Sequence, residues 1–212
     1  MRIGFVGSGN IGGTLARLFS RAGHEVAVSN SRGPDTLDGL VAELGPGARA
    51  VTAPEAAAFG DVVVVAIPYG RFRELPAEPF TGKIVVDADN YYPQRGHVDE
   101  LDSGKATSTG LLARHLPGAR VLKGFNTLYY GNLLERGRPD APAGDRLAIA
   151  IAGDDAEAKA VLTDLVDQLG FTAVDTGALD ESWRQEPGTP VFGNAVGPDE
   201  ATALIAQARR KG

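Results

Sequence analysis

The stretch Met1–Arg32 carries the pattern that most restricts how this chain can fold. A short apolar segment, Arg2–Val6, runs into a turn with glycines at positions 7, 9 and 12. The segment Gly13–Ala22 then places apolar side chains at steps of three and four, as in an amphipathic helix. A second apolar segment, Glu25–Ser29, follows. This order of strand, glycine turn, helix and strand predicts a βαβ unit.

The glycines of this turn stand in the G-x-G-x-x-G register of dinucleotide-binding folds. Gly7 permits the tight turn, Gly9 lets the backbone approach a pyrophosphate, and Gly12 lets the helix pack closely on the strand. The start of the helix offers free N–H groups and the positive end of its dipole to phosphate. We therefore expect a dinucleotide here, bound by the residues of the turn: Gly7, Ser8, Gly9, Asn10, Ile11 and Gly12.

The end of the second predicted strand indicates which dinucleotide is bound. Folds that bind NAD usually carry an acidic residue about 20 positions beyond the glycines, where it bonds the ribose 2′-hydroxyl. This chain has Asn30, Ser31 and Arg32 there and no carboxylate. A hydroxyl and a guanidinium favour a 2′-phosphate, and the guanidinium can also lie against adenine. We therefore predict that these three residues bind NADP(H) rather than NAD(H).

Further apolar segments alternate with helical patterns along the rest of the chain. The predicted strands are Ala48–Val51, Asp61–Ile67, Gly82–Ala88, Arg120–Gly124, Arg146–Ala152 and Phe171–Asp175. The predicted helical regions are Gly33–Gly47, Pro54–Phe59, Arg71–Leu75, Leu111–Leu116, Asp154–Leu169 and Asp199–Lys211, and Ser182–Pro198 is expected to be irregular. The alternation predicts an α/β fold: a doubly wound Rossmann-type parallel sheet with a small C-terminal α/β extension.

Glycines and prolines are dense between Gly137 and Gly144, which is typical of a boundary loop. We therefore predict an NADP-binding Rossmann domain at residues 1–142 and the small C-terminal α/β extension at residues 143–212.

Three successive predicted strands end in the segments Ile67-Pro68-Tyr69, Asp89-Asn90-Tyr91 and Phe125-Asn126-Thr127. Ligands of open α/β sheets bind beyond the carboxyl ends of the strands, so we expect these segments to meet at a nicotinamide pocket. Ile67, Pro68 and Tyr69 are predicted to border the cofactor. Asn126 and Asn90 are the candidate catalytic residues, because an amide beside a reacting ring can both donate and accept. The alternative for Asn126 is an amide that only bonds its own turn.

Composition excludes several classes of protein. The 212 residues carry a net charge of −6 with no basic cluster, so we expect no nucleic-acid partner. The chain has no cysteine, and its three histidines are scattered, so we expect neither disulfides nor a metal site. No apolar run approaches membrane-spanning length, and the first predicted strand begins at Arg2. We therefore expect no membrane association, no signal peptide and a cytoplasmic location.

With these residues in view, the chain resembles the coenzyme F420-dependent NADP oxidoreductase family. The resemblance covers most of the chain up to about Gly177, and the Lys-Gly-Phe-Asn-Thr box at 123–127 is its more specific part. The other matching segments are Gly7–Gly12, Ser31-Arg32, Ala66-Ile67-Pro68, Ile151–Asp155 and Leu169-Gly170-Phe171. The resemblance implies reversible hydride transfer between NADPH and an oxidised deazaflavin, and a homodimer.

Two segments depart from the family, at positions 89–93 and 183–193, and they leave the small-molecule electron acceptor open. Coenzyme F420 and a flavin-like acceptor are both compatible with the NADP-binding frame. Hydride transfer between two ring cofactors needs little from side chains beyond position and exclusion of water. The alternatives are an NADPH-dependent reductase of a small carbonyl or imine substrate, and a non-catalytic NADP(H)-binding sensor protein.

Overall fold

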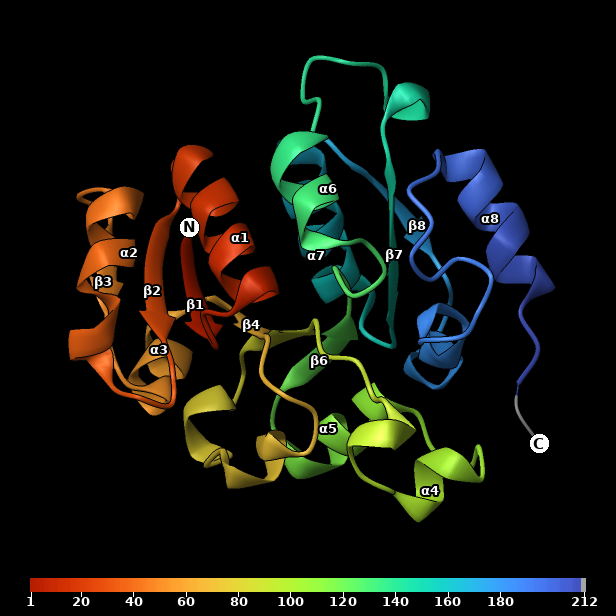
Figure 1. Cartoon of the computed structure of the whole chain (residues 1–212), viewed down its shortest axis with the longest axis horizontal. Helices are drawn as coiled ribbons and strands as arrows, with labels where there is room; N and C mark the ends of the chain where they lie inside the picture. The colour runs from red at the N-terminus through yellow and green to blue at the C-terminus, as the bar shows by residue number, and fades with distance from the viewer. Residues whose placement is uncertain (211–212) are drawn as a thin grey trace.

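Eight strands lie side by side in the order β3-β2-β1-β4-β5-β6-β7-β8 (Figure 1). The computed structural model describes residues 1–210. The strands are β1 (Arg2–Val6), β2 (Glu25–Ser29), β3 (Ala48–Ala50), β4 (Val62–Val65), β5 (Ile84–Asp87), β6 (Arg120–Lys123), β7 (Ala148–Gly153) and β8 (Thr172–Asp175). The α-helices are α1 (Asn10–Arg21), α2 (Asp38–Leu44), α3 (Ala53–Phe59), α4 (Asp99–Asp102), α5 (Ser108–His115), α6 (Tyr130–Glu135), α7 (Ala156–Gln168) and α8 (Pro198–Gln207). Short 3-10 turns are η1 (Pro34–Leu37), η2 (Arg71–Glu74), η3 (Glu78–Phe80), η4 (Pro93–Arg95), η5 (Ala143–Asp145) and η6 (Leu179–Gln185).

After β1 the chain forms β2 and β3 on one side of β1, and it then forms β4 on the other side. The strand order therefore reverses between β1 and β4, which is the topological switch point of the sheet. Phe5 of β1 is opposite Val28 of β2 and Val64 of β4, and both pairings are parallel. All strands from β3 to β6 are parallel, and so are β7 and β8. The predicted doubly wound Rossmann-type fold is therefore confirmed.

The junction between β6 and β7 was not predicted: these strands are antiparallel. Leu122 pairs with Gly153, and Lys123 pairs with Ala152. A Cβ at Gly153 would lie 2.2 Å from a methyl of Leu122, so glycine allows this contact. The segment predicted as an extension thus continues the sheet, and the division into residues 1–142 and 143–212 stays a prediction.

Alternate side chains of the strands face two opposite layers of helices. Ile3 and Phe5 of β1 join one buried cluster with side chains of α1, α2, α6 and α7. Val6 joins another with α3 and α5, and Ala148 and Ala150 of β7 pack with α8. Figure 1 shows α1 and α6 as neighbours in the first of these layers. Cover on both faces explains why the central strand β4, which reads Val-Val-Val-Val, is continuously apolar rather than alternating with polar residues.

Several predicted boundaries are corrected by the structure. The region predicted as irregular begins inside η6, and α6 follows the Lys-Gly-Phe-Asn-Thr box without having been predicted. The last predicted helix ends earlier, at Gln207, and Lys211 lies outside the described residues. Among residues 1–210, no helix combines the length and the apolar character needed to cross a membrane.

The layers depend on close backbone approach at β1. A Cβ at Gly4 would lie 2.0 Å from the carbonyl oxygen of Ala56 in α3. A Cβ at Gly12 would lie 2.0 Å from the carbonyl oxygen of Gly7. Both contacts are between backbones, which cannot move aside as a flexible side chain can. The helices α1 and α3 therefore approach β1 because glycine occupies these positions.

We expect Gly4→Ala to lower the free energy of unfolding by about 1–3 kcal/mol, as other overpacked core positions do. Gly39→Ala is the matched control, since Gly39 lies in α2 and has open space around an added Cβ. There the gain in helix propensity should raise stability by about 0.5–1 kcal/mol. Urea unfolding measures both variants, and equal midpoints for Gly4→Ala and wild type would contradict the close packing.

Candidate functional site

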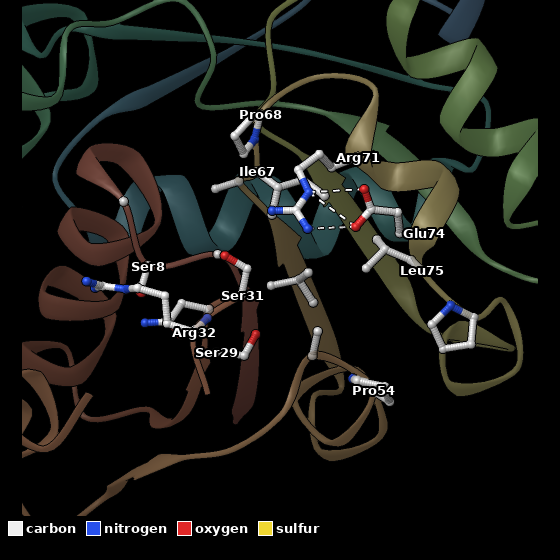
Figure 2. Close-up of a pocket in the computed structure, with 17 residues that line it drawn as sticks. Ser8, Ser29, Ser31, Arg32, Pro54, Ile67, Pro68, Arg71, Glu74 and Leu75 are labelled. Atoms are coloured by element: carbon white, nitrogen blue, oxygen red, sulfur yellow. Dashed lines mark hydrogen bonds and ion pairs between the residues drawn. The ribbon is translucent and has the colours of Figure 1, made fainter. Parts of the chain in front are cut away.

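A pocket of about 470 Å³ opens beyond the carboxyl ends of β1, β2 and β4 (Figure 2). Figure 2 shows Ser31 and Arg32 on one side of it and Arg71 with Glu74 on the other. The pocket is lined by Val6, Gly7, Ser8, Gly9, Ser29, Asn30, Ser31, Arg32, Ala53, Pro54, Ala66, Ile67, Pro68, Arg71, Glu74, Leu75 and Pro76. It therefore lies at the switch point between β1 and β4, where open α/β sheets bind ligands.

The glycine turn forms the wall of the pocket next to α1. Gly7 has φ +106°, and its N–H donates to the carbonyl oxygen of Ser29 at 3.2 Å, which ties the end of β1 to the end of β2. Gly9 is the residue before α1, and a Cβ built there meets nothing within 4 Å. Among residues 1–210, no side chain caps this end of α1 by a hydrogen bond. The turn therefore presents open space and uncapped amides to a ligand.

The loop after β2 holds its shape through Asn30. The Asn30 side-chain oxygen accepts from the backbone N–H of Arg32 at 2.9 Å, and its amide nitrogen donates to Thr36 Oγ1 at 2.9 Å. The Arg32 side chain is exposed, and within residues 1–210 its guanidinium makes no hydrogen bond or ion pair. Asn30 thus supports the loop, while Ser31 and Arg32 present a hydroxyl and a positive charge to the pocket.

The structure brings eight of the predicted cofactor-binding residues together around this pocket: Gly7, Ser8, Gly9, Asn30, Ser31, Arg32, Ile67 and Pro68. Asn10, Ile11 and Gly12 lie in the first turn of α1, outside the lining. Tyr69, Asn90 and Asn126 also lie outside it, beyond the ends of the neighbouring strands β4, β5 and β6. Cofactor binding by each residue stays a prediction.

Asn90 and Asn126, the predicted catalytic pair, meet in a network of amides. The Asn126 side-chain nitrogen donates to Asn90 Oδ1 at 3.1 Å and to the Gln185 carbonyl oxygen at 2.7 Å. Its side-chain oxygen accepts from Gln185 Nε2 at 2.9 Å. Asn126 is 3% exposed, and both its amide hydrogens are used within the protein. Contact with a cofactor ring would require an exchange of one of these bonds, so the catalytic role of Asn126 stays a prediction.

A buried charge cluster lies beside this network and was not among the predicted site residues. Lys123 at the end of β6 is fully buried, and its ammonium donates to Asp87 Oδ2 at 3.1 Å and to the carbonyl oxygen of Asp89. Thr109 Oγ1 donates to the same Asp87 oxygen at 2.6 Å. Charged residues at the ends of two adjacent apolar segments were the sequence signal for this cluster.

The cluster reaches the pocket wall through Asp89. The Asp89 carboxylate accepts from the backbone N–H of Ile67 at 2.7 Å, which fixes the turn after β4. Burial and the charge of Asp87 raise the pKa of Asp89 well above its usual range, while Lys123 and the Ile67 N–H oppose this shift. Lys123, Asp87 and Asp89 therefore support Ile67, which lines the pocket.

Tyr69 follows this turn and packs between aromatic neighbours. Its ring centroid lies 5.2 Å from that of Tyr91 and 5.4 Å from that of Phe72. Within residues 1–210, its buried hydroxyl has no hydrogen-bond partner. Burial and the charge of Asp87 raise the pKa of Tyr69, so the hydroxyl stays neutral and keeps its proton.

Across residues 1–210, no three histidine, aspartate or glutamate side chains gather in a way that could hold a metal ion.

The profile of a family described as NADP oxidoreductase, coenzyme F420-dependent, matches residues 2–91. The metalloreductase STEAP3 of Rattus norvegicus is 30% identical over 180 residues, which are 84% of this chain and 34% of the rat protein. This chain therefore spans about a third of the length of that relative.

Two solved structures match over most of their length. The hypothetical protein SMa0349 of Sinorhizobium meliloti is 31% identical with a TM-score of 0.75, covering 92% of this chain and 94% of the other. A candidate F420-dependent NADP reductase of Arthrobacter sp. FB24 is 25% identical with a TM-score of 0.71, covering 86% of each chain.

We expect Lys123→Met to lower the free energy of unfolding by about 3–5 kcal/mol, because it leaves the buried Asp87 without its cation. Arg114→Met is the control: Arg114 pairs with Glu100 at 2.7 Å, but both side chains are exposed, so the change should stay within about 0.5 kcal/mol. Chemical denaturation compares the two. Equal losses would mean that the buried cluster contributes no more than a surface pair.

Proposed function

The chain belongs to the coenzyme F420-dependent NADP oxidoreductase family, and from this membership we propose that it is an NADP-dependent oxidoreductase. In the proposed reaction, a hydride passes between NADPH and a deazaflavin such as F420, or a flavin-like acceptor. The observation that carries the proposal is the pocket that joins the glycine turn to Ser31 and Arg32.

The residues of this pocket fit the phosphates of NADPH. The pyrophosphate would lie at Gly9 and the uncapped start of α1, where no Cβ blocks the approach. The 2′-phosphate would be held by Ser31 and Arg32, whose hydroxyl and guanidinium form charge-assisted hydrogen bonds with such a group. No acidic side chain lines the pocket near Arg32 in the part of the chain that the structure describes, apart from Glu74 on the opposite side.

The nicotinamide end would extend from Ile67 and Pro68 toward the ends of β5 and β6. Bound NADPH supplies the hydride, so the protein need only position two rings and exclude water. Tyr69, Asn90 and Asn126 are the proposed polar residues on this side, with a neutral hydroxyl and amides that add no charge beside the reacting rings. The predicted homodimer and cytoplasmic location stay predictions.

We expect Arg32→Ala to weaken NADPH binding by about 1–3 kcal/mol, the worth of a charge-assisted hydrogen bond, and to change NADH binding little. Titration calorimetry with both nucleotides measures this. Arg21→Ala serves as the control, since Arg21 is an exposed arginine at the far end of α1 that does not line the pocket. An equal loss for NADPH and NADH would contradict the assignment of the 2′-phosphate to Arg32.

We expect the protein to oxidise NADPH when F420 or a flavin is present. Purified protein with saturating NADPH is mixed separately with F420, FMN, FAD and riboflavin, and the loss of NADPH absorbance is followed. Arg32→Ala should raise the KM for NADPH with little change in kcat, because the 2′-phosphate is remote from the reacting ring. NADPH that binds but is oxidised with none of the four acceptors would contradict the proposed reaction.

A further inference from the structure

A second arginine lines the pocket across from Arg32. Arg71 and Glu74 belong to η2, the short turn between β4 and β5, and Figure 2 shows them on the side opposite Ser31 and Arg32. Arg71 Nη2 donates to Glu74 Oε2 at 2.7 Å, and Arg71 Nε lies 3.2 Å from both carboxylate oxygens. The guanidinium is thus turned toward Glu74.

The guanidinium of Arg71 can leave Glu74 for another partner at little cost in free energy. The side chains of Arg71 and Glu74 are 48% and 62% exposed, and exposed pairs contribute little net stability because water screens them. A guanidinium is a planar fork of donors that binds a phosphate as well as a carboxylate, and it stacks on flat rings. An arriving nucleotide can therefore replace Glu74 as the partner of Arg71.

The charges of the pocket make this exchange favourable for NADPH. Among the described residues that line it, the charged ones are Arg32, Arg71 and Glu74. While Arg71 and Glu74 are paired, their charges cancel and Arg32 alone attracts an anion. The 2′-phosphate adds negative charge that NADH lacks, so it favours Arg71 and disfavours the Glu74 carboxylate.

Apolar residues beside the pair provide a surface for a flat base. Leu75 and Pro76 follow Glu74 directly, while Ala53 and Pro54 begin α3, and all four line the pocket. Adenine is planar and apolar on its faces, so an adenosine end placed here would lie within reach of η2. The base would then be close to Arg71, and the 2′-phosphate would lie in the pocket that Arg71 and Arg32 line from opposite sides.

We propose that Arg71 is a second cofactor-binding arginine, held by Glu74 until the nucleotide arrives, and that this pair sets how strongly the pocket prefers NADPH over NADH. The inference rests on the proposed function, because it assigns Arg71 and Glu74 to the adenosine 2′-phosphate end of the same cofactor. Arg71 gains a stronger partner on binding, and Glu74 lowers the affinity for the phosphate in return.

Three single variants test the proposal by calorimetry with NADPH and NADH. Arg71→Met should weaken NADPH about tenfold or more, with a smaller effect on NADH, because a hydrogen bond between charged groups is lost. Glu74→Gln should tighten NADPH by about threefold, since it releases Arg71 and removes a negative charge. Arg73→Met is the matched control: Arg73 lies on the same turn, packs on the Phe72 ring at 5.2 Å, and does not line the pocket.

The double variant Arg71→Met with Glu74→Gln should bind NADPH more tightly than Arg71→Met alone, because the carboxylate left without its cation is removed. An Arg71→Met variant that binds NADPH like Arg73→Met, or that loses NADPH and NADH affinity equally, would overturn the role of Arg71. If Glu74→Gln weakened NADPH, Glu74 would not compete with the cofactor. If the wild-type protein bound neither nucleotide, the proposed function itself would be wrong. If the wild-type protein bound NADPH and only the variants failed to behave as expected, the role of Arg71 and Glu74 alone would be wrong.

Discussion

The structure depends on a backbone contact that only glycine permits, at the point where β1 turns into α1. Gly7 takes a positive φ of 106°, and Gly12 in α1 comes so close that its Cβ would lie 2.0 Å from the Gly7 carbonyl oxygen. The same turn donates a hydrogen bond to Ser29 at the end of β2. Helix, central strand and second strand are therefore fixed together, and the space beyond them becomes the pocket. An added Cβ would lie 2.0 Å from the Gly7 carbonyl oxygen if placed at Gly12, and 2.2 Å from the Ala66 carbonyl oxygen if placed at Gly7, so a side chain at either position would force the turn out of this shape.

A second constraint lies beyond β4 in the sheet, in the buried charges at the ends of β5 and β6. Two aspartates and one lysine cannot stay buried unless each finds partners, and here they find them in one another, in Thr109 and in the Ile67 backbone. The bond to Ile67 carries this order into the pocket wall. Burying these charges costs free energy, and the hydrogen bonds of the cluster hold the turn after β4 in a fixed position. This explains why a lysine follows the buried apolar residues Val121 and Leu122 at the end of β6.

The sequence was sufficient for the features that depend on local pattern. The glycine register and the apolar segments predicted the doubly wound sheet, because each signal lies within a few neighbouring residues. The direction of β7 was not predictable, since its alternating alanine and isoleucine suit a parallel or an antiparallel partner equally. The partner of Asn126 was not predictable either, because Gln185 lies 59 residues away in a segment that showed no regular pattern. The sequence predicted only a helical region at Arg71–Leu75, and the position of Arg71 and Glu74 across the pocket from Arg32 depends on the folded chain.

The two halves of the site differ in how their polar groups are used. Around the pocket, Arg32 makes no ion pair within residues 1–210, and Arg71 pairs with Glu74, whose side chain is exposed. Toward β5 and β6, the amides of Asn126 and Gln185 and the charge of Lys123 are satisfied by buried partners. Groups of the first kind can rearrange for an incoming charged ligand at little cost, whereas groups of the second kind hold their geometry. Under the proposed function, an adaptable end would select the nucleotide by its phosphate, and a rigid end would hold the ring where a hydride must pass.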